Sequence, residues 1–100
     1  MMAAKPQLDR ERIAEFCRRR RICRLALFGS VLRDDFGEGS DLDILVEFEP
    51  GARTGLAFFA MQDELSAITG CKVDLCTPGF LSPHFRDRVL REARDIYVAA

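Results

Sequence analysis

The chain has 100 residues, of which 48% are hydrophobic and 31% charged, and its formal net charge is −1, a globular composition that excludes intrinsic disorder. No apolar run approaches the roughly 20 residues that cross a bilayer, and no secretory signal is visible at the N-terminus. We therefore expect one domain over residues 1–100, in the cytoplasm and not in a membrane.

In the first half of the chain, the apolar pattern predicts one helix and two strands. The helix covers about 8–20, with Asp9 as its N-cap. A short strand at 24–28 stops at a glycine and leads into a helical turn or short helix at 30–36. The clearest strand is 41–49, where alternate residues face opposite sides of a sheet. The residues expected to face the core are Ile13, Phe16 and Cys17 in the helix and Leu42, Ile44, Val46 and Phe48 in the strand.

The second half predicts two more helices around a third strand. The first helix covers 56–69 and ends at Gly70, a residue type that favours the left-handed conformation of a C-cap. The strand covers 72–77 and the last helix about 81–93, after which the tail either adds a short strand or docks. The elements together predict a small sheet with helices packed on it. Apolar residues at regular spacing are Phe58, Met61, Leu65 and Ile68, then Val73 and Leu75, then Phe85, Val89 and Ala93.

Gly29 and Ser30 join the first strand to the helical turn. Glycine can adopt positive φ and lets the backbone approach a ligand closely, and serine is a favourable N-cap. The free N–H groups at the start of a helix favour an anion. The dipeptide therefore fits phosphate binding, although a strand followed by Gly-Ser is more often just a turn and a helix cap.

Asp41 and Asp43 open the clearest strand. Residues two apart in a strand share a face, with Cα atoms about 6.5–7 Å apart, so the two ionised carboxylates repel each other. A shared divalent cation removes that repulsion, and carboxylates with phosphate oxygens and waters are the usual Mg²⁺ ligands. The alternative is that both are solvated at the strand entrance, as we expect for Glu47 and Glu49 on the same face.

Asp74 lies mid-strand, on the face opposite Val73 and Leu75. If its strand lies beside the strand 41–49, three carboxylates converge and could hold two metal ions about 4 Å apart, as in phosphoryl or nucleotidyl transfer. One of them could also accept the proton of the incoming hydroxyl group. Taken alone, Asp74 fits an exposed surface residue as well.

The residues of these motifs resemble a known pattern. Gly29-Ser30, ten further residues and Asp41-Leu42-Asp43 resemble the GSx10DxD pattern of the DNA polymerase beta-like nucleotidyltransferase superfamily. The segment LFGSVLRDDFGEGSDLDILVEFEPG is similar to its small branch, the minimal nucleotidyltransferase (MNT) antitoxins, and KVDLCTP supplies the third acid. The resemblance implies the nucleotidyltransferase fold of the α+β class, a small mixed β-sheet flanked by helices. It also implies Mg²⁺-dependent transfer of AMP from ATP, in the MNT branch to a tyrosine of a HEPN-type RNase toxin, by a protein adenylyltransferase that acts as the antitoxin.

The resemblance also assigns roles by position. It implies that Gly29 and Ser30 hold the triphosphate, and that Asp41, Asp43 and Asp74 form the catalytic and metal-binding set. Arg33 matches the arginine of the family's GSxxR stretch and would contact phosphate; an ion pair with Asp34 or Asp35 is the alternative. The loop reads EGSD where the family commonly has PDSD, so Glu38-Gly39 is a departure that leaves the predicted metal ligands untouched.

Two features leave other functions open. Arginines at positions 18–21 could bind nucleic acid or an acidic partner, or form a solvated helix end that suits the helix dipole. The chain could also act as an antitoxin by binding its toxin alone, without catalysis. The four cysteines contain no CxxC pair, so we expect free thiols in a reducing compartment and neither disulfides nor a zinc site.

Overall fold

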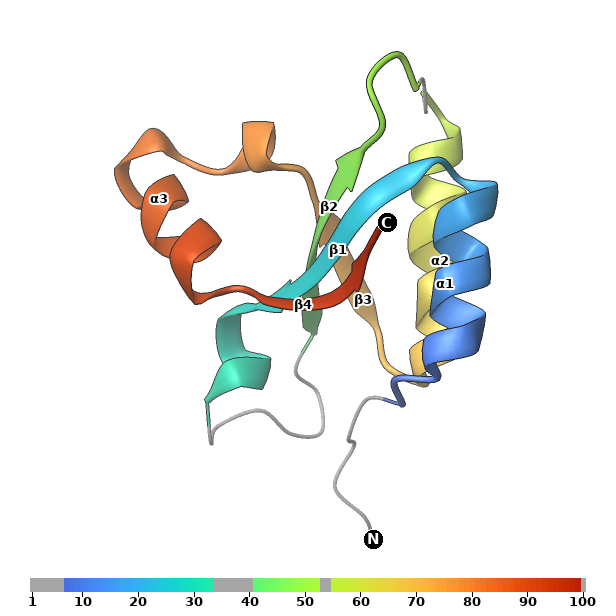
Figure 1. Ribbon diagram of the computed structural model, residues 1–100. Helices are drawn as coiled ribbons and strands as arrows, with labels where there is room; N and C mark the ends of the chain where they lie inside the picture. Colours follow the sequence, from blue (N-terminus) through green and yellow to red (C-terminus); the bar gives the residue numbers. More distant parts are fainter. Residues whose placement is uncertain (1–6, 34–40, 53–54, 100) are drawn as a thin grey trace, which may run out of the picture.

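The computed structural model describes residues 7–33, 41–52 and 55–99 as a four-stranded sheet with helices on both faces (Figure 1). The elements in chain order are α1 (Arg10–Arg19), β1 (Ile22–Phe28), the 3₁₀ turn η1 (Gly29–Leu32), β2 (Leu42–Phe48), α2 (Ala57–Thr69), β3 (Val73–Cys76), the 3₁₀ turn η2 (Pro78–Phe80), α3 (Pro83–Glu92) and β4 (Arg94–Val98). No helix within these ranges has the length and hydropathy that crossing a membrane requires.

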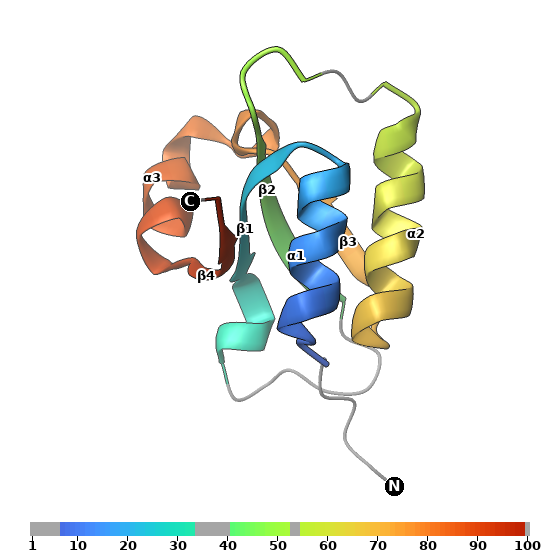
Figure 2. The same ribbon diagram turned by 45° about the vertical axis from the view of Figure 1, so that its right-hand side comes forward.

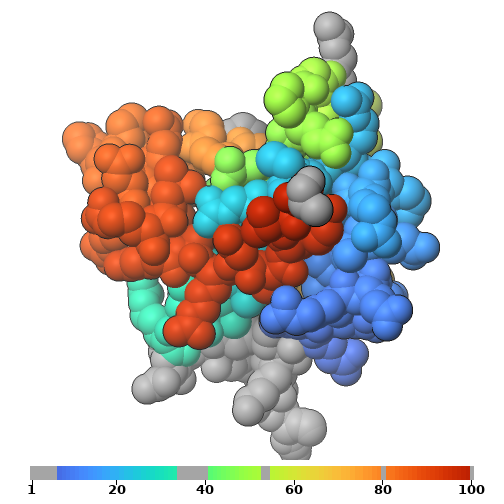
Figure 3. All heavy atoms as spheres, viewed as in Figure 1, coloured from blue at the N-terminus to red at the C-terminus, as the bar shows by residue number. Residues whose placement is uncertain are grey.

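The sheet has the order β3-β2-β1-β4. β1 runs antiparallel to β2 and to β4, whereas β2 and β3 run parallel. The small mixed sheet flanked by helices is therefore confirmed. The tail, for which the sequence left two outcomes open, forms the edge strand β4, which Figure 3 shows lying between α3 and α1.

Helices α1 and α2 lie side by side on one face of the sheet, and α3 lies on the other (Figure 2). The predicted N-cap of α1 is confirmed, since the Asp9 carboxylate accepts a hydrogen bond from the Arg12 N–H at 3.2 Å. The predicted C-cap of α2 is confirmed as well, because Gly70 adopts a left-handed φ of 74°. The core-facing residues of both helices are buried, namely Ile13, Phe16, Cys17, Met61, Leu65 and Ile68.

β1 begins two residues earlier than the sequence predicted. Arg21 adopts a left-handed φ of 58°, so the chain reverses within one residue after α1. Ile22 is already fully buried and paired with Phe48 of β2. The remaining elements agree with the predicted ranges within the one or two residues by which such boundaries vary, except η1, whose predicted end lies outside the described residues.

α3 packs more loosely than its sequence pattern predicted. Val89 and Ala93 contact a small buried cluster made of Ala26, Leu45 and Leu81. Phe85, expected at the same spacing, is 47% exposed, and no residue of α3 is fully buried. A helix of ten residues that covers only part of a sheet face therefore leaves an aromatic side chain facing solvent.

Candidate active site

Asp43 and Asp74 lie opposite each other on neighbouring strands. The parallel register of β2 and β3 pairs them directly, so both side chains stand on one face of the sheet. Asp43 is half-buried and Asp74 is exposed. The expectation that the Asp74 strand lies beside the Asp41–Asp43 strand is thus confirmed, and two of the three predicted acids meet across one strand pair.

Asp41 lies immediately before β2 and is exposed at the entrance to the strand. Burial raises the pKa of the Asp43 carboxyl above its ordinary value, and the charges of Asp74 and Asp41 raise it further. The charges of both other aspartates therefore act on Asp43, and the three carboxylates concentrate negative charge at this edge of the sheet. An arrangement of this kind favours a cation.

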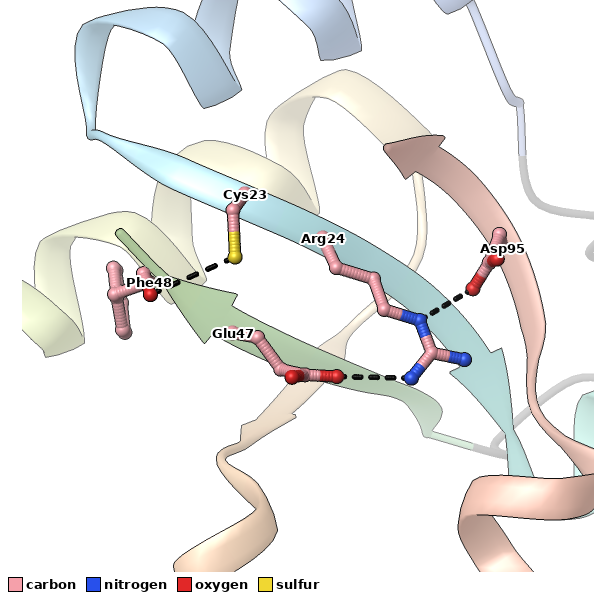
Figure 4. Close-up of polar contacts among 5 residues, drawn as sticks. All are labelled: Cys23, Arg24, Glu47, Phe48 and Asp95. Carbon is pink, nitrogen blue, oxygen red and sulfur yellow. Dashed lines mark hydrogen bonds and ion pairs between the residues drawn. The ribbon is translucent and has the colours of Figure 1, made fainter. Parts of the chain in front are cut away.

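The acids along β2 divide into two kinds. Glu47 accepts a hydrogen bond at 2.9 Å from Nη1 of Arg24, whose Nε also donates to Asp95 at 2.6 Å (Figure 4). Glu49 lies 3.4 Å from Nε of Arg21. Both glutamates are partly exposed, in agreement with the solvated alternative, and they also form ion pairs that the sequence did not predict. By contrast, no basic side chain within residues 7–33, 41–52 and 55–99 forms an ion pair with any of the three aspartates.

The three aspartates fit a hard divalent cation by their chemistry. They supply carboxylate oxygens, and no cation of the described chain neutralises them. Within that part of the chain, however, no three His, Cys, Asp or Glu side chains are gathered closely enough to hold a metal ion. The three carboxylates thus lie on adjacent elements but are not close enough together to coordinate one ion. Mg²⁺ binding therefore stays a prediction.

Gly29 ends β1 directly against Asp43. It adopts a φ of 78°, in the left-handed region that favours glycine. A Cβ at this position would overlap the Asp43 carboxylate and lie 3.2 Å from its Cγ. Phe28, just before the glycine, is the cross-strand partner of Asp43. The glycine is therefore needed twice, for its backbone conformation and for the space that the acid occupies.

Ser30 lies inside η1 and not at its N-cap, so that prediction is wrong. The N-cap position belongs to Phe28, which makes no capping hydrogen bond. Because Gly29 already belongs to the turn, the turn begins two residues earlier than a serine cap would allow. Arg33 follows η1, is exposed, and donates its backbone N–H to the Ser30 carbonyl at 2.9 Å. The residues Asp34, Asp35, Phe36, Glu38 and Gly39, on which other sequence interpretations depend, lie outside the described ranges.

Comparison with known families matches residues 10–96 to the family described as nucleotidyltransferase domain. The chain belongs to this family. A Methanocaldococcus jannaschii relative, named provisionally as a protein adenylyltransferase, is 40% identical over 73% of this chain and 77% of its own length. Protein adenylyltransferase MntA of Thermococcus cleftensis is 38% identical over 74% of this chain and 72% of its own length. The chain is thus an enzyme of the nucleotidyltransferase class.

Solved structures place the nucleotidyltransferase within its minimal branch. One, described provisionally as a minimal nucleotidyltransferase, is 42% identical, with a TM-score of 0.70 over 84% of this chain and 85% of that chain. Two others share the fold alone. A toxin–antitoxin structure with AMP-PNP has 19% identity and a TM-score of 0.71 over 91% of this chain and 74% of that chain. A tri-AMPylated Shewanella oneidensis HEPN toxin with its MNT antitoxin has 20% identity and a TM-score of 0.64, over 93% and 72%. The predicted resemblance to the MNT family is confirmed.

Cys76 is a neighbour of the acids that the sequence analysis did not single out. It follows Asp74 by two residues in β3 and so lies on the same face. Burial raises the pKa of its thiol to about 11, and the charges of Asp74 and Asp43 contribute. The alternation of side chains along a strand could have predicted this position, because residues 74 and 76 are two apart and therefore share a face. All four cysteines are free, as predicted, and burial raises the pKa of Cys17 to about 12, so that thiol is inert.

The arginine cluster at 18–21 mostly braces the nucleotidyltransferase internally. Arg19 and Arg20 both bind Glu64 of α2, with N–O distances of 2.6 and 3.0 Å. Arg21 pairs with Glu49, as noted above, which leaves Arg18 exposed without an ion pair to a described residue. Three of the four arginines are thus held by acids of the same molecule, and their contact with nucleic acid stays an untested alternative.

Proposed function

We propose that this nucleotidyltransferase moves AMP from ATP to a tyrosine hydroxyl group of a HEPN-type toxin in a Mg²⁺-dependent reaction, and so acts as the toxin's antitoxin. Two relatives with about 40% identity carry the name protein adenylyltransferase. Structures that share the fold contain an ATP analogue in one case and an AMPylated HEPN toxin in another. These findings support an adenosine nucleotide as donor and a protein as acceptor.

The observation that carries the proposal is the pairing of Asp43 with Asp74 beside Gly29. It brings the end of β1, the start of β2 and the middle of β3 to one edge of the sheet. The donor's triphosphate lies against the backbone of Gly29 and Ser30, where no Cβ projects from the glycine. Exposed Arg33 is positioned to neutralise phosphate charge. Mg²⁺, held by Asp41, Asp43 and Asp74, would offset the charge that develops on the leaving group.

Transfer then needs a group that accepts the proton of the incoming hydroxyl. Asp74 is exposed, whereas Asp43 is half-buried against Gly29, so an acceptor protein reaches Asp74 more readily. The hydroxyl oxygen bonds to the α-phosphorus as the bond between that phosphorus and the α–β bridging oxygen breaks. Pyrophosphate leaves, and the hydroxyl proton passes to the Asp74 carboxylate. The chain's own residues thereby position the triphosphate and remove one proton.

The test uses ATP labelled at the α-phosphate, Mg²⁺ and the protein encoded by the neighbouring gene. We expect label to appear on that protein and its RNase activity to fall. Asp74→Asn should slow labelling about 10²–10⁴-fold, the usual contribution of a general base, and Asp43→Asn should also abolish most of it. Asp63→Asn on the exposed side of α2 is the matched control and should label at the normal rate.

Equal labelling by all three variants would contradict the assignment. If the chain silences the neighbouring protein without ATP, and continues to do so when Asp43 and Asp74 are both replaced, it is an antitoxin that acts by binding alone.

A further inference from the structure

We infer that the pocket between η1 and α3 holds the adenine ring of the donor nucleotide. The inference rests on the proposed function and names a subsite for it. The pocket has a volume of about 330 Å³, within the range of small-ligand sites. Gly29 lines it, together with three apolar side chains, those of Phe28, Phe85 and Val89.

The pocket lies on the same face of the sheet as the paired aspartates. Phe28 is the cross-strand partner of Asp43 in the antiparallel β1–β2 ladder, so the two side chains stand on one face. α3 covers part of this same face, where Val89 packs with Phe28 against the small buried cluster. Gly29 touches both places, because it borders the pocket and lies against the Asp43 carboxylate. A nucleotide whose phosphates lie at Gly29 therefore has its base within reach of the pocket.

The wall of the pocket suits a planar heteroaromatic ring. Phe85 is 47% exposed on a helix in which no residue is fully buried, so its ring does not serve the core. Stacking of a base on an exposed aromatic side chain contributes binding energy that does not depend on a hydrogen-bond pattern. The half-buried Phe28 offers a second apolar surface against the same volume.

The charged rim of the pocket suits the rest of the nucleotide. Arg33 and Arg88 line it together with Glu92, whose carboxylate lies 3.7 Å from Nε of Arg88. A neighbouring hollow shares Gly29, Arg33 and Glu92 and adds Arg94 from the start of β4. Arg94 is exposed and forms no ion pair with a residue in the described ranges. Three arginines, Arg33, Arg88 and Arg94, thus line the two hollows that share Gly29, and their charge suits the phosphates of a nucleotide.

The experiment compares two exposed phenylalanines. Binding of AMP-PNP with Mg²⁺ and of inorganic tripolyphosphate with Mg²⁺ is measured by calorimetry on the full chain. Phe85→Ala should weaken AMP-PNP binding about ten- to a hundredfold, the loss of one stacked ring, and leave tripolyphosphate binding unchanged. Phe59→Ala is the matched control, because Phe59 is 64% exposed on α2, on the opposite face of the sheet. It should bind both compounds as the unchanged protein does, and Phe85→Trp should restore AMP-PNP affinity.

The outcomes separate the subsite from the proposed function. If Phe85→Ala binds AMP-PNP normally while labelled AMP is still transferred, the subsite is wrong and the function stands. The subsite is also overturned if Phe85→Ala loses tripolyphosphate affinity equally, since the effect then does not concern the base. If the unchanged protein binds neither AMP-PNP nor tripolyphosphate and transfers no label, the proposed function fails and the subsite fails with it. Because Phe85 is exposed, its variants should unfold at nearly the same denaturant concentration as the parent, which checks that they are folded.

Discussion

The two faces of the sheet differ in how they use their side chains. The face under α1 and α2 is filled with fully buried large residues such as Ile13, Phe16 and Leu65. Among the described residues, the buried cluster on the face under α3 is small and consists of Ala26, Leu45 and Leu81. Hydrophobic burial is the dominant stabilising term in folding, so the first face supplies most of the stability.

The face under α3 carries the acidic side chains of the candidate site. Asp43, half-buried and without a basic partner in the described chain, lies there with Asp74, and the aromatic pocket adjoins them. Concentrated like charge reduces stability and an exposed aromatic ring adds little to it, and such features are typical of functional sites. The comparison teaches that stability and chemistry are separated by the sheet itself. The following predictions test this separation, in order of their expected effect on the free energy of unfolding.

The largest effect is expected from Phe16→Ala on the α1 face. Phe16 is fully buried, and removing such a ring costs about 3–5 kcal/mol through lost burial and the cavity left behind. That is a large part of a typical total of about 5–15 kcal/mol. Denaturant unfolding measures it, and Phe85→Ala on the α3 face should cost less than about 1 kcal/mol. Equal losses at the two positions would remove the distinction between the faces.

The second prediction concerns the junction between β1 and the acids. Gly29→Ala should cost about 2–4 kcal/mol, because alanine is strained at positive φ and its Cβ displaces the Asp43 side chain. Gly51→Ala is the matched control, since Gly51 has a φ of 85° with nothing within 4 Å of the added carbon. It should cost only the backbone strain, about 1–2 kcal/mol. Equal losses in thermal or denaturant unfolding would show that the contact with Asp43 has no energetic weight.

The comparison of these two glycines also shows what the sequence could and could not predict. The alternating pattern of 41–49 and the helical spacing of 56–69 were sufficient to predict β2 and α2, because both are set by local periodicity. The sequence predicts the adjacency of Asp74 and Asp43 only if their two strands are neighbours, since strand order is a long-range property that periodicity does not contain. The close approach of Gly29 to Asp43 depends on a β1–β2 register that no pattern in the sequence gives.

The errors have similar causes. Ser30 was expected as an N-cap from its residue type, but the positive φ of Gly29 moved the start of the turn. Phe85 was expected to share a stripe with Val89 and Ala93, although spacing alone does not say how much of a sheet face a short helix covers. Tertiary packing decided both positions, and both lie at the candidate site, where local rules are most often broken.

The third prediction tests the brace between α1 and α2 behind the core. Glu64 accepts from Arg19 and Arg20, and these contacts lower its pKa, with the Arg19 hydrogen bond the largest cause. Glu64→Gln should therefore cost about 0.5–1 kcal/mol at pH 7, since the pair is partly solvent-screened. A lowered folded-state pKa gives stability that is present above the unfolded pKa of about 4.3 and lost as pH falls through the folded value. The difference between Glu64→Gln and the parent should accordingly shrink below about pH 4. A difference that stays constant from pH 7 to pH 3 would contradict the assigned ion pairs.

The smallest effect on stability is expected where the effect on function is greatest. In a buffer containing a chelator, Asp43→Asn should leave the free energy of unfolding unchanged or slightly higher at pH 7. The substitution removes a carboxylate whose ionised form is disfavoured by burial and by the charges of Asp74 and Asp41. Asp95→Asn is the control on the same sheet, because Asp95 is paired with Arg24 at 2.6 Å and its loss should cost about 0.2–1 kcal/mol. If Asp43→Asn lowers the free energy of unfolding more than Asp95→Asn does, the charge of Asp43 stabilises the fold and the prediction is wrong. If it is as stable as the parent yet transfers no AMP, the acids of the α3 face are retained for chemistry at no benefit to stability.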